Sequence, residues 1–237
     1  MKILSLDSAT ESASCAILDG NKLLGEITFN YKKQHSVILM NIIDSLLKNL
    51  NLKINDIDGY IVSKGPGSFT GLRIGAATIK GLSQGCKKPF VSVSSLDALA
   101  YNMAYTSGLI CPILDALRGN VYTCLYKFSN GNLEKIGDYA VISIEELIQI
   151  IINKNAPVCF IGDALFKFKD ILKESIPNAN FAPTHLNLVK ASALGEIGLN
   201  LLRNGIQDDI FSFSPIYIRK SQAEREYEKK HGVSIYE

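Results

Sequence analysis

Hydrophobic residues along this chain of 237 residues follow two periods, and the two alternate. Short apolar runs bounded by turn residues predict strands, at residues 2–7, 15–18, 23–29, 59–62, 89–93, 109–115, 121–128, 133–136 and 158–163. Apolar residues three or four apart predict helices, at residues 36–50, 70–85, 94–105, 144–152, 164–175 and 190–203. This alternation predicts an α/β fold in which mixed sheets are flanked by helices.

The same order of elements occurs twice. Each copy begins with an apolar strand that ends in an aspartate, Asp7 in the first and Asp115 in the second, about 108 residues apart. A hairpin, a helix, a strand, a turn containing glycine and a further helix follow in both. The duplication predicts two subdomains of like topology and a charged tail, at residues 1–105, 106–219 and 220–237. We also expect the helix at 190–203 to pack back on the first subdomain.

A glycine-rich segment, SKGPGSFTGLRIG at residues 63–75, lies between the strand at 59–62 and the helix at 70–85. Glycines allow backbone angles closed to other residues, and Ser68 or Thr70 can cap the helix. A strand, a glycine turn and a helix start together aim backbone N–H groups at an anion. The segment lacks the Gly-Lys-Ser/Thr of a Walker A loop. The spacing is equally compatible with a tight turn that binds no ligand.

Two helices carry more apolar or small residues than one packed face requires. In the helix at 36–50, Val37 and Met40 widen the apolar stripe. In the helix at 70–85, glycines recur three or four residues apart, although a glycine inside a helix costs about 1 kcal/mol relative to alanine. These patterns indicate either deep burial within the chain or a second surface where another backbone approaches closely.

The composition narrows the function classes. A net charge of +2 and the absence of tryptophan argue against a strong grip on nucleic acid by this chain alone. The five cysteines are widely spaced with no Cys-x-x-Cys pair, as is typical of a reducing compartment. The chain begins directly with a strand, without a signal peptide, and no apolar run is long enough to span a bilayer. We therefore expect a soluble cytoplasmic protein without membrane contact.

Residues suited to catalysis or metal binding are sparse. The histidines, His35, His185 and His231, are isolated from one another, so no metal site is predicted. No Gly-x-Ser-x-Gly elbow marks a serine hydrolase. The duplicated strand, aspartate and hairpin resemble the actin-like superfamily of sugar kinases and heat-shock ATPases, which has a ribonuclease H-like fold and binds nucleotide between its halves. The candidate residues of such a cleft, interpreted here as vestigial, are Asp7, Gly65, Gly67, Ser68, Thr70 and Asp115.

The segment GPGSFTGLRIG at residues 65–75 closely resembles the signature of the bacterial TsaB family, also called YeaZ. Further matches follow in the family's order: ILSLDS at 3–8, HS at 35–36, VSSLDALA at 93–100, DALRGNVY at 115–122 and PIYIR at 215–219. Two motifs depart modestly from the family, which usually has Asp-Thr-Ser at the end of the first strand and Asp-Ala-Arg-Arg-Gly in the second half. The resemblance covers nearly the whole chain.

The resemblance implies a non-catalytic dimerisation and scaffold subunit. TsaB proteins pair with a catalytic paralogue, TsaD, and act with the ATPase TsaE to install threonylcarbamoyl on N6 of adenosine 37 in tRNAs that read codons beginning with A. The resemblance further implies a homodimer when the chain is alone, tRNA contact through the complex, no cofactor on this chain alone, and ATP or ADP with Mg only at the complex interface. The family's dimer surface corresponds here to His35, Leu39, Ile42, Ile43, Leu46, Gly71, Arg73, Ile74, Gly75, Thr78 and Leu82.

This interpretation carries a testable expectation and two alternatives. If the glycine-lined helix faces another chain, Gly75→Leu disrupts pairing and leaves the monomer folded. The main alternative is a stand-alone ATP-binding transferase or kinase-like enzyme that uses Asp7 and Asp115 around a nucleotide. A peptidase is the third reading, and the sequence offers no nucleophile–base or metal pair for it.

Overall fold

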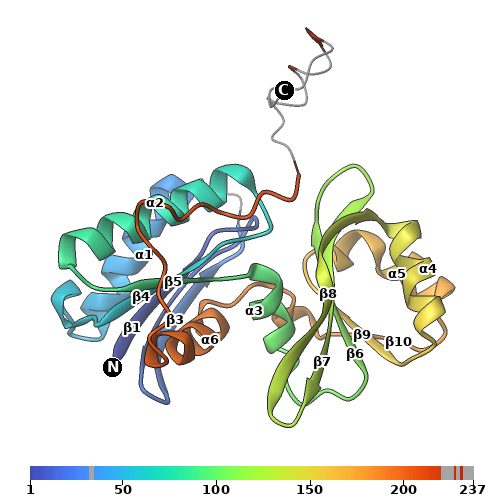
Figure 1. The fold of residues 1–237 in the computed structure, drawn as a ribbon, viewed down its shortest axis with the longest axis horizontal. Coiled ribbons are helices and arrows are strands. Elements are labelled where there is room, and N and C mark those ends of the chain that lie inside the picture. The colour runs from blue at the N-terminus through green and yellow to red at the C-terminus, as the bar shows by residue number, and fades with distance from the viewer. Residues whose placement is uncertain (32–34, 220–226, 228–229, 232–237) are drawn as a thin grey trace.

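The computed structural model of the protein describes residues 1–31, 35–219, 227, 230 and 231, so the predicted charged tail lies largely outside the described residues. Each half of the chain forms a five-stranded mixed sheet (Figure 1). The first sheet has the order β3-β2-β1-β4-β5 and consists of β1 (Lys2–Asp7), β2 (Ala13–Asp19), β3 (Lys22–Phe29), β4 (Gly59–Ser63) and β5 (Phe90–Val93). The second has the order β10-β9-β6-β7-β8 and consists of β6 (Leu109–Asp115), β7 (Asn120–Ser129), β8 (Asn132–Ser143), β9 (Val158–Ile161) and β10 (Ala179–Phe181).

The two sheets share one topology. Strand β1 pairs antiparallel with β2 and parallel with β4, and β6 pairs in the same way with β7 and β9. Asp7 and Asp115 therefore end equivalent central strands. The duplicated α/β architecture expected from the sequence is confirmed.

Helices flank both sheets. The described helices are α1 (His35–Asn49), α2 (Phe69–Cys86), α3 (Ser95–Tyr101), α4 (Ile144–Lys154), α5 (Leu165–Ser175) and α6 (Ala191–Arg203), with single 3-10 turns at Ile54–Asp56 and Thr184–Leu186. Helices α1 and α2 pack on one face of the first sheet and α6 packs on the other, while α4 and α5 pack on the second sheet (Figure 1). Successive residues of a strand point to opposite faces, so Leu4 packs toward α1 while Ile3 packs toward α6.

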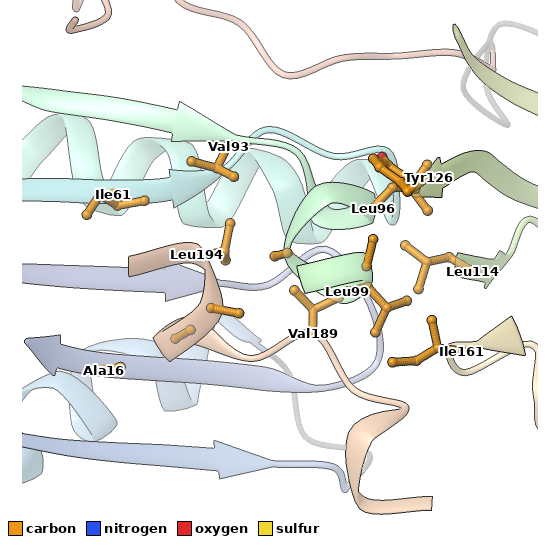
Figure 2. Close-up of a cluster of buried hydrophobic side chains, with 14 of the residues drawn as sticks. Ala16, Ile61, Val93, Leu96, Leu99, Leu114, Tyr126, Ile161, Val189 and Leu194 are labelled. Carbon is orange, nitrogen blue, oxygen red and sulfur yellow. The ribbon is translucent and has the colours of Figure 1, made fainter. Parts of the chain in front are cut away.

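One hydrophobic cluster spans the two subdomains. Helix α3 lies between the sheets, and Leu96 and Leu99 from it are fully buried (Figure 2). They belong to one cluster with Ile61 of the first sheet and with Leu114 and Ile161 of the second. The subdomains are therefore not independent bodies joined by a linker.

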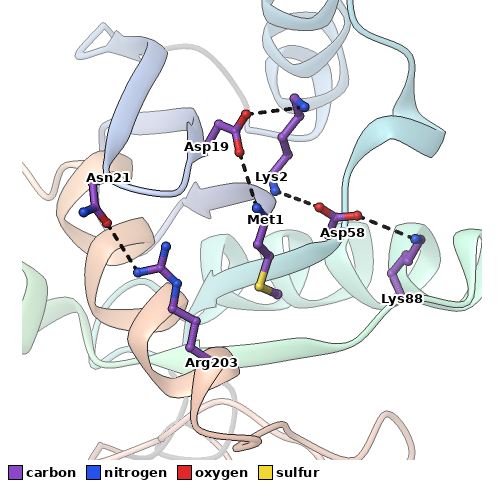
Figure 3. Close-up of polar contacts among 7 residues, drawn as sticks. All are labelled: Met1, Lys2, Asp19, Asn21, Asp58, Lys88 and Arg203. Carbon is purple, nitrogen blue, oxygen red and sulfur yellow. Dashed lines mark hydrogen bonds and ion pairs between the residues drawn. The ribbon is translucent and has the colours of Figure 1, made fainter.

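Helix α6 lies on the first sheet although it follows the second subdomain in sequence. The Ala191 N–H at its start donates to Ser14 Oγ of β2 at 3.0 Å. A Cβ at Gly198 would lie 2.5 Å from the Ile61 side chain, so the glycine allows the helix to approach β4 closely. At its end, Arg203 Nη1 donates to Asn21 Oδ1 at 3.4 Å (Figure 3).

The structure differs from the sequence expectation mainly in exposed strands. Strand β8 extends far beyond the predicted 133–136, and β10 was not predicted. Neither has a fully buried residue, so neither shows the apolar run by which buried strands are recognised. Helix α3 ends at Tyr101 rather than near residue 105, where Tyr105 has a φ of +67°. Among the described residues, no helix has the length and hydropathy needed to cross a membrane.

Candidate functional site at the subdomain boundary and on helices α1 and α2

Asp7 is fully buried at the end of β1, and within the described residues neither carboxylate oxygen has a hydrogen-bond partner. The hydroxyl of Ser63, at the end of β4, is also buried and lies near this carboxylate, without a hydrogen bond of ordinary geometry in that part of the chain. Burial is the main cause that raises the pKa of Asp7 from 3.8 to about 7. The nearby Ser63 hydroxyl and Ala9 backbone lower this pKa in part, and the charge of Asp163 raises it. Asp7 therefore titrates near neutral pH.

Asp115 occupies the equivalent place in the second sheet but has different surroundings. Its carboxylate forms an ion pair with Nζ of Lys167 on α5. It also accepts a hydrogen bond from the Leu117 N–H at 3.0 Å, and its own N–H donates to Asp163 Oδ1 at 2.9 Å. The Asp115 carboxylate is thus engaged within its own subdomain.

Asp163, just after β9, is the acidic residue that our site prediction omitted. Burial is the main cause that raises its pKa from 3.8 to about 6, and the negative charges of Asp115 and Glu11 add to this rise. The Asp115 N–H and the positive charge of Lys167 act in the opposite direction and lower the pKa in part. Glu11 and Asp7 belong to the first subdomain, so carboxylates from both subdomains influence one another across the boundary. The available signal was an aspartate directly after a buried strand, as at Asp7 and Asp115.

The glycine segment packs against the turn that follows β1. The Ser68 N–H donates to the Ala9 carbonyl at 2.6 Å, and a Cβ at Gly67 would lie 2.1 Å from that oxygen. Gly65, at a φ of +92°, accepts a hydrogen bond from the Ser95 N–H at the start of α3. Ser68 caps α2, since its Oγ accepts from the Gly71 N–H at 3.3 Å, as the sequence predicted. Close packing within the chain accounts for these glycines without a bound anion.

The cleft candidates do not fit a metal-bound nucleotide as a set. The N–H of Ser68 is directed at Ala9, and the carboxylate of Asp115 is paired with Lys167. Thr70 is exposed on α2. Within the ranges that the structure describes, no three His, Cys, Asp or Glu side chains are grouped as metal ligands.

The sequence-predicted interface on α1 requires a correction. Four of its residues pack in the core between α1 and the first sheet, namely Leu39, Ile42, Ile43 and Leu46. They face this chain's own sheet because the widest apolar side of the helix is the side that the sheet covers. The exposed apolar residues of α1 are Val37 and Met40, at 61% and 52%. His35 begins α1, and its side chain lies outside the described part of the chain.

A second correction concerns the start of α2. Gly71 and Gly75 are buried, and the Gly71 carbonyl accepts a hydrogen bond from Ser8 Oγ at 2.8 Å. A Cβ at Gly75 would lie 2.4 Å from Ser8 Oγ. The small size of Gly75 therefore serves the fit between α2 and the turn that follows β1 in this chain, and Gly75→Leu would disturb the subdomain itself.

The outer side of α2 carries the exposed residues of this helix, of which Arg73 already contacts Phe69 and Tyr217. Arg73, Ala77, Gly81 and Gly85 are exposed at intervals of four residues, and a Cβ at Gly81 or Gly85 would meet nothing within 4 Å. The predicted interface residues at intermediate burial are Ile74, Thr78 and Leu82. We define the α1–α2 face as Val37, Met40, Arg73, Ala77, Gly81 and Gly85.

The C-terminal strap, residues 215–219, crosses from the first subdomain to the second. The Ile216 N–H donates to the Lys64 carbonyl at 2.8 Å. The Tyr217 ring lies 4.6 Å from the Phe69 ring, and Arg73 Nε donates to Tyr217 Oη at 3.3 Å. Arg219 Nη1 donates to the carbonyl of Ala116, beyond β6. Three sequence motifs far apart along the chain therefore meet beside the start of α2.

Comparisons with known proteins agree with this assembly of motifs. A family model described as TsaD, tRNA N6-adenosine threonylcarbamoyltransferase, matches residues 22–227. The tRNA threonylcarbamoyladenosine biosynthesis protein TsaB of Bacillus subtilis (strain 168) is 32% identical, over 96% of this chain and 98% of that protein. The chain belongs to the TsaB family. The match to a TsaD model indicates that this TsaB-family chain is related in sequence to TsaD proteins.

Solved structures support the fold of this TsaB-family chain. A Pseudomonas aeruginosa protein described as similar to peptidase YeaZ matches with a TM-score of 0.77 and 23% identity, over 92% of this chain and 99% of that one. The ROK hexokinase of Thermus thermophilus matches with a TM-score of 0.50 and 11% identity, over 86% of this chain and 100% of that one. At these identities the likeness concerns the fold alone, which is the actin-like, sugar kinase-like fold expected from the sequence.

Proposed function

We propose that this chain is a non-catalytic, partner-binding subunit in the biosynthesis of threonylcarbamoyladenosine in tRNA. The observation that carries the proposal is the similarity to the Bacillus subtilis TsaB protein along almost the full length of both chains. Its main partner is a TsaD-like catalytic paralogue, with a TsaE-like ATPase as a further partner and a homodimer as the form of the isolated chain. The tRNA is bound by the complex rather than tightly by this chain.

The α1–α2 face is the surface that we assign to pairing. Gly81 and Gly85 leave open space at the middle and end of α2, so a helix of another chain can approach closely there. Val37 and Met40 add exposed apolar area on the neighbouring helix. The opposite sides of both helices are already committed to the first sheet, which leaves this outer side for a partner.

A supporting rather than catalytic role agrees with the chemistry of the described residues. The thiols of Cys15 and Cys111 are buried, and burial raises the pKa of Cys111 to about 12 and that of Cys15 further, so neither is an available nucleophile. Asp115 is neutralised by Lys167. We therefore expect no cofactor on this chain alone, and we place ATP or ADP with Mg, where the complex uses them, at the interface with a partner.

Light scattering tests the pairing directly. We expect the chain alone to have the mass of a dimer, and an equimolar mixture with the TsaD-like protein of the same organism to form a one-to-one complex. Gly81→Leu should weaken both assemblies because it fills the space that the partner helix needs, while the folded chain stays at least as stable as the wild type. Asn153→Leu, at an exposed site on α4 of the second subdomain, is the matched control and should pair normally.

Two results would overturn the pairing proposal: a wild-type chain that is monomeric in both samples, or a folded Gly81→Leu variant that pairs as well as the control. Nucleotide titration then addresses the alternative function, an ATP-binding transferase or kinase-like enzyme. Tight Mg-dependent ATP binding with turnover by this chain alone would favour that enzyme. Weak binding without turnover would favour the subunit.

A further inference from the structure

Arg73, an exposed residue on the outer side of α2, is held by two aromatic rings. Its guanidinium carbon lies 4.0 Å from the centre of the Phe69 ring, one turn earlier on the same helix, and 5.9 Å from the centre of the Tyr217 ring of the strap. Arg73 Nε also donates to Tyr217 Oη at 3.3 Å. These contacts fix the direction of a side chain that otherwise has many rotamers. The guanidinium is therefore preorganised although it is exposed.

The terminal nitrogens of Arg73 remain unused within the part of the chain that the structure describes. A guanidinium has five N–H donors, and among the described residues only the one on Nε has an acceptor. In the same part of the chain Arg73 forms no ion pair with a carboxylate. The two terminal nitrogens form a planar fork that matches the two oxygens of a carboxylate. Arg73 thus presents a fixed donor pair that suits one acidic side chain.

The surroundings of Arg73 favour a protein carboxylate over the phosphates of a nucleic acid. Arg73 is the one charged residue of the α1–α2 face, and the others are apolar or small, namely Val37, Met40, Ala77, Gly81 and Gly85. A nucleic acid backbone is gripped by several cations together, whereas an arginine among apolar residues is typical of the energetic centre of a protein interface. A guanidinium covered by a partner without an acceptor would weaken the pairing.

A second copy of this chain is poorly equipped to supply that acceptor. In a symmetric dimer the same face meets itself, so the acceptor must come from the same elements. Helices α1 and α2 contain one acidic residue, Asp44, and its carboxylate is paired with Lys48 Nζ at 2.7 Å. Beyond the end of α2, Asp209 Oδ1 accepts from two backbone N–H groups of its own turn, at 2.8 and 3.1 Å. Both carboxylates are therefore already engaged.

We infer that Arg73 binds an acidic side chain of the TsaD-like partner and makes this pairing tighter than self-pairing. Tyr217 and Phe69 are positioning residues, because they orient the guanidinium without contacting the partner's carboxylate. The strap at 215–219 thereby acquires a role in the choice of partner. The inference rests on the proposed function, since it assumes that both pairings use the α1–α2 face.

Dissociation constants of the two assemblies test the role of Arg73. We expect Arg73→Gln to raise the Kd of the complex with the TsaD-like protein of the same organism at least about tenfold. The Kd of the homodimer should change by no more than about twofold. Raising the salt concentration from about 0.05 M to about 0.5 M should weaken the wild-type complex more than the variant complex. Arg203→Gln makes the same substitution on α6, which covers the opposite face of the first sheet, and should leave both constants unchanged.

Tyr217→Phe tests the positioning role, because it keeps the ring and removes the hydroxyl that holds Arg73 Nε. Alone it should raise the Kd of the complex by about two- to tenfold, and in the Arg73→Gln background it should add nothing. Replacing the exposed aspartates and glutamates of the TsaD-like protein one at a time, by asparagine or glutamine, identifies the acceptor. The substitution that removes it should likewise add nothing to Arg73→Gln.

The outcomes separate this inference from the proposed function. A wild-type chain that does not pair with the TsaD-like protein overturns both. A complex that forms but is insensitive to Arg73→Gln, or an equal weakening of complex and homodimer, overturns the role of Arg73 alone. The same holds if Asp44→Asn weakens the homodimer as Arg73→Gln does, because self-pairing would then supply the acceptor. Additive effects of Tyr217→Phe and Arg73→Gln overturn the positioning role of the strap.

Discussion

At the scale of single residues, two glycines of α2 have opposite surroundings. A Cβ at Gly75 would lie 2.4 Å from Ser8 Oγ, whereas one at Gly81 would meet nothing within 4 Å. We expect Gly75→Ala to lower the free energy of unfolding by about 1–3 kcal/mol through overpacking. Gly81→Ala should raise it by about 0.5–1 kcal/mol because alanine favours the helix. Urea unfolding of both variants measures the difference, and equal stabilities would contradict the assigned packing.

Asp7 should make the stability of the whole protein depend on pH. Its pKa is raised to about 7 in the folded chain, so its contribution to stability is complete below the unfolded-state pKa and is lost as the pH rises through 7. The free energy of unfolding of Asp7→Asn minus that of the wild type should therefore be larger at about pH 8 than at about pH 5. Chemical unfolding at both pH values provides the measurement. A stability difference between the two proteins that is the same at both pH values would show that Asp7 is not the group responsible.

At the scale of elements, the strap should stabilise the junction between the subdomains. Tyr217→Ala removes a ring that packs on Phe69 and accepts a hydrogen bond from Arg73. We expect a loss of about 1 kcal/mol, which lowers the melting temperature by about 2–4 °C in a chain of this size. Phe211→Ala serves as the control, because Phe211 lies in the preceding segment and is 85% exposed. An equal effect of both substitutions would mean that the strap contacts add no stability.

The elements themselves could largely be predicted from the sequence, because buried strands and amphipathic helices carry strong local periods. The sequence does not predict which side of a helix packs against the sheet. In α1, the stripe containing Leu39 and Ile43 is apolar whether a sheet or another chain covers it. The same holds for the glycine segment, where Gly67 is explained by the Ala9 carbonyl of a distant turn. Such positions are decided by tertiary packing, which no local pattern records.

At the scale of the whole molecule, the repeat predicted two subdomains but not how they are joined. Asp163 was absent from the predicted site because its importance comes from Asp7 and Glu11 of the other subdomain. Likewise, α6 ends the chain's second half yet covers the first sheet. Residues 1–105 therefore lack one of the two layers that bury their sheet. A division of the chain at residue 105 separates two halves in sequence but leaves the first without half of its cover.

This arrangement makes a prediction about fragments. A fragment of residues 1–105 exposes the sheet face around Ile3 and Ile61, which α6 covers in the intact chain, so we expect it to be unfolded or aggregated. Adding residues 188–219 through a short linker should restore folding. The connection is feasible because Asn102 Nδ2 donates to the carbonyls of Leu186 and Leu188, both at 3.2 Å.

Circular dichroism and amide NMR dispersion distinguish the two fragments. The joined fragment still lacks the second-subdomain side of the shared core around α3, so it should be folded but less stable than the intact chain. Gly198→Leu in the joined fragment is the matched control, because a side chain there collides with Ile61 and should prevent α6 from docking. A folded, monomeric 1–105 fragment would show that α6 is dispensable to the first subdomain. A joined fragment that stays unfolded, like its Gly198→Leu control, would show instead that the second subdomain is the cover that the first one needs.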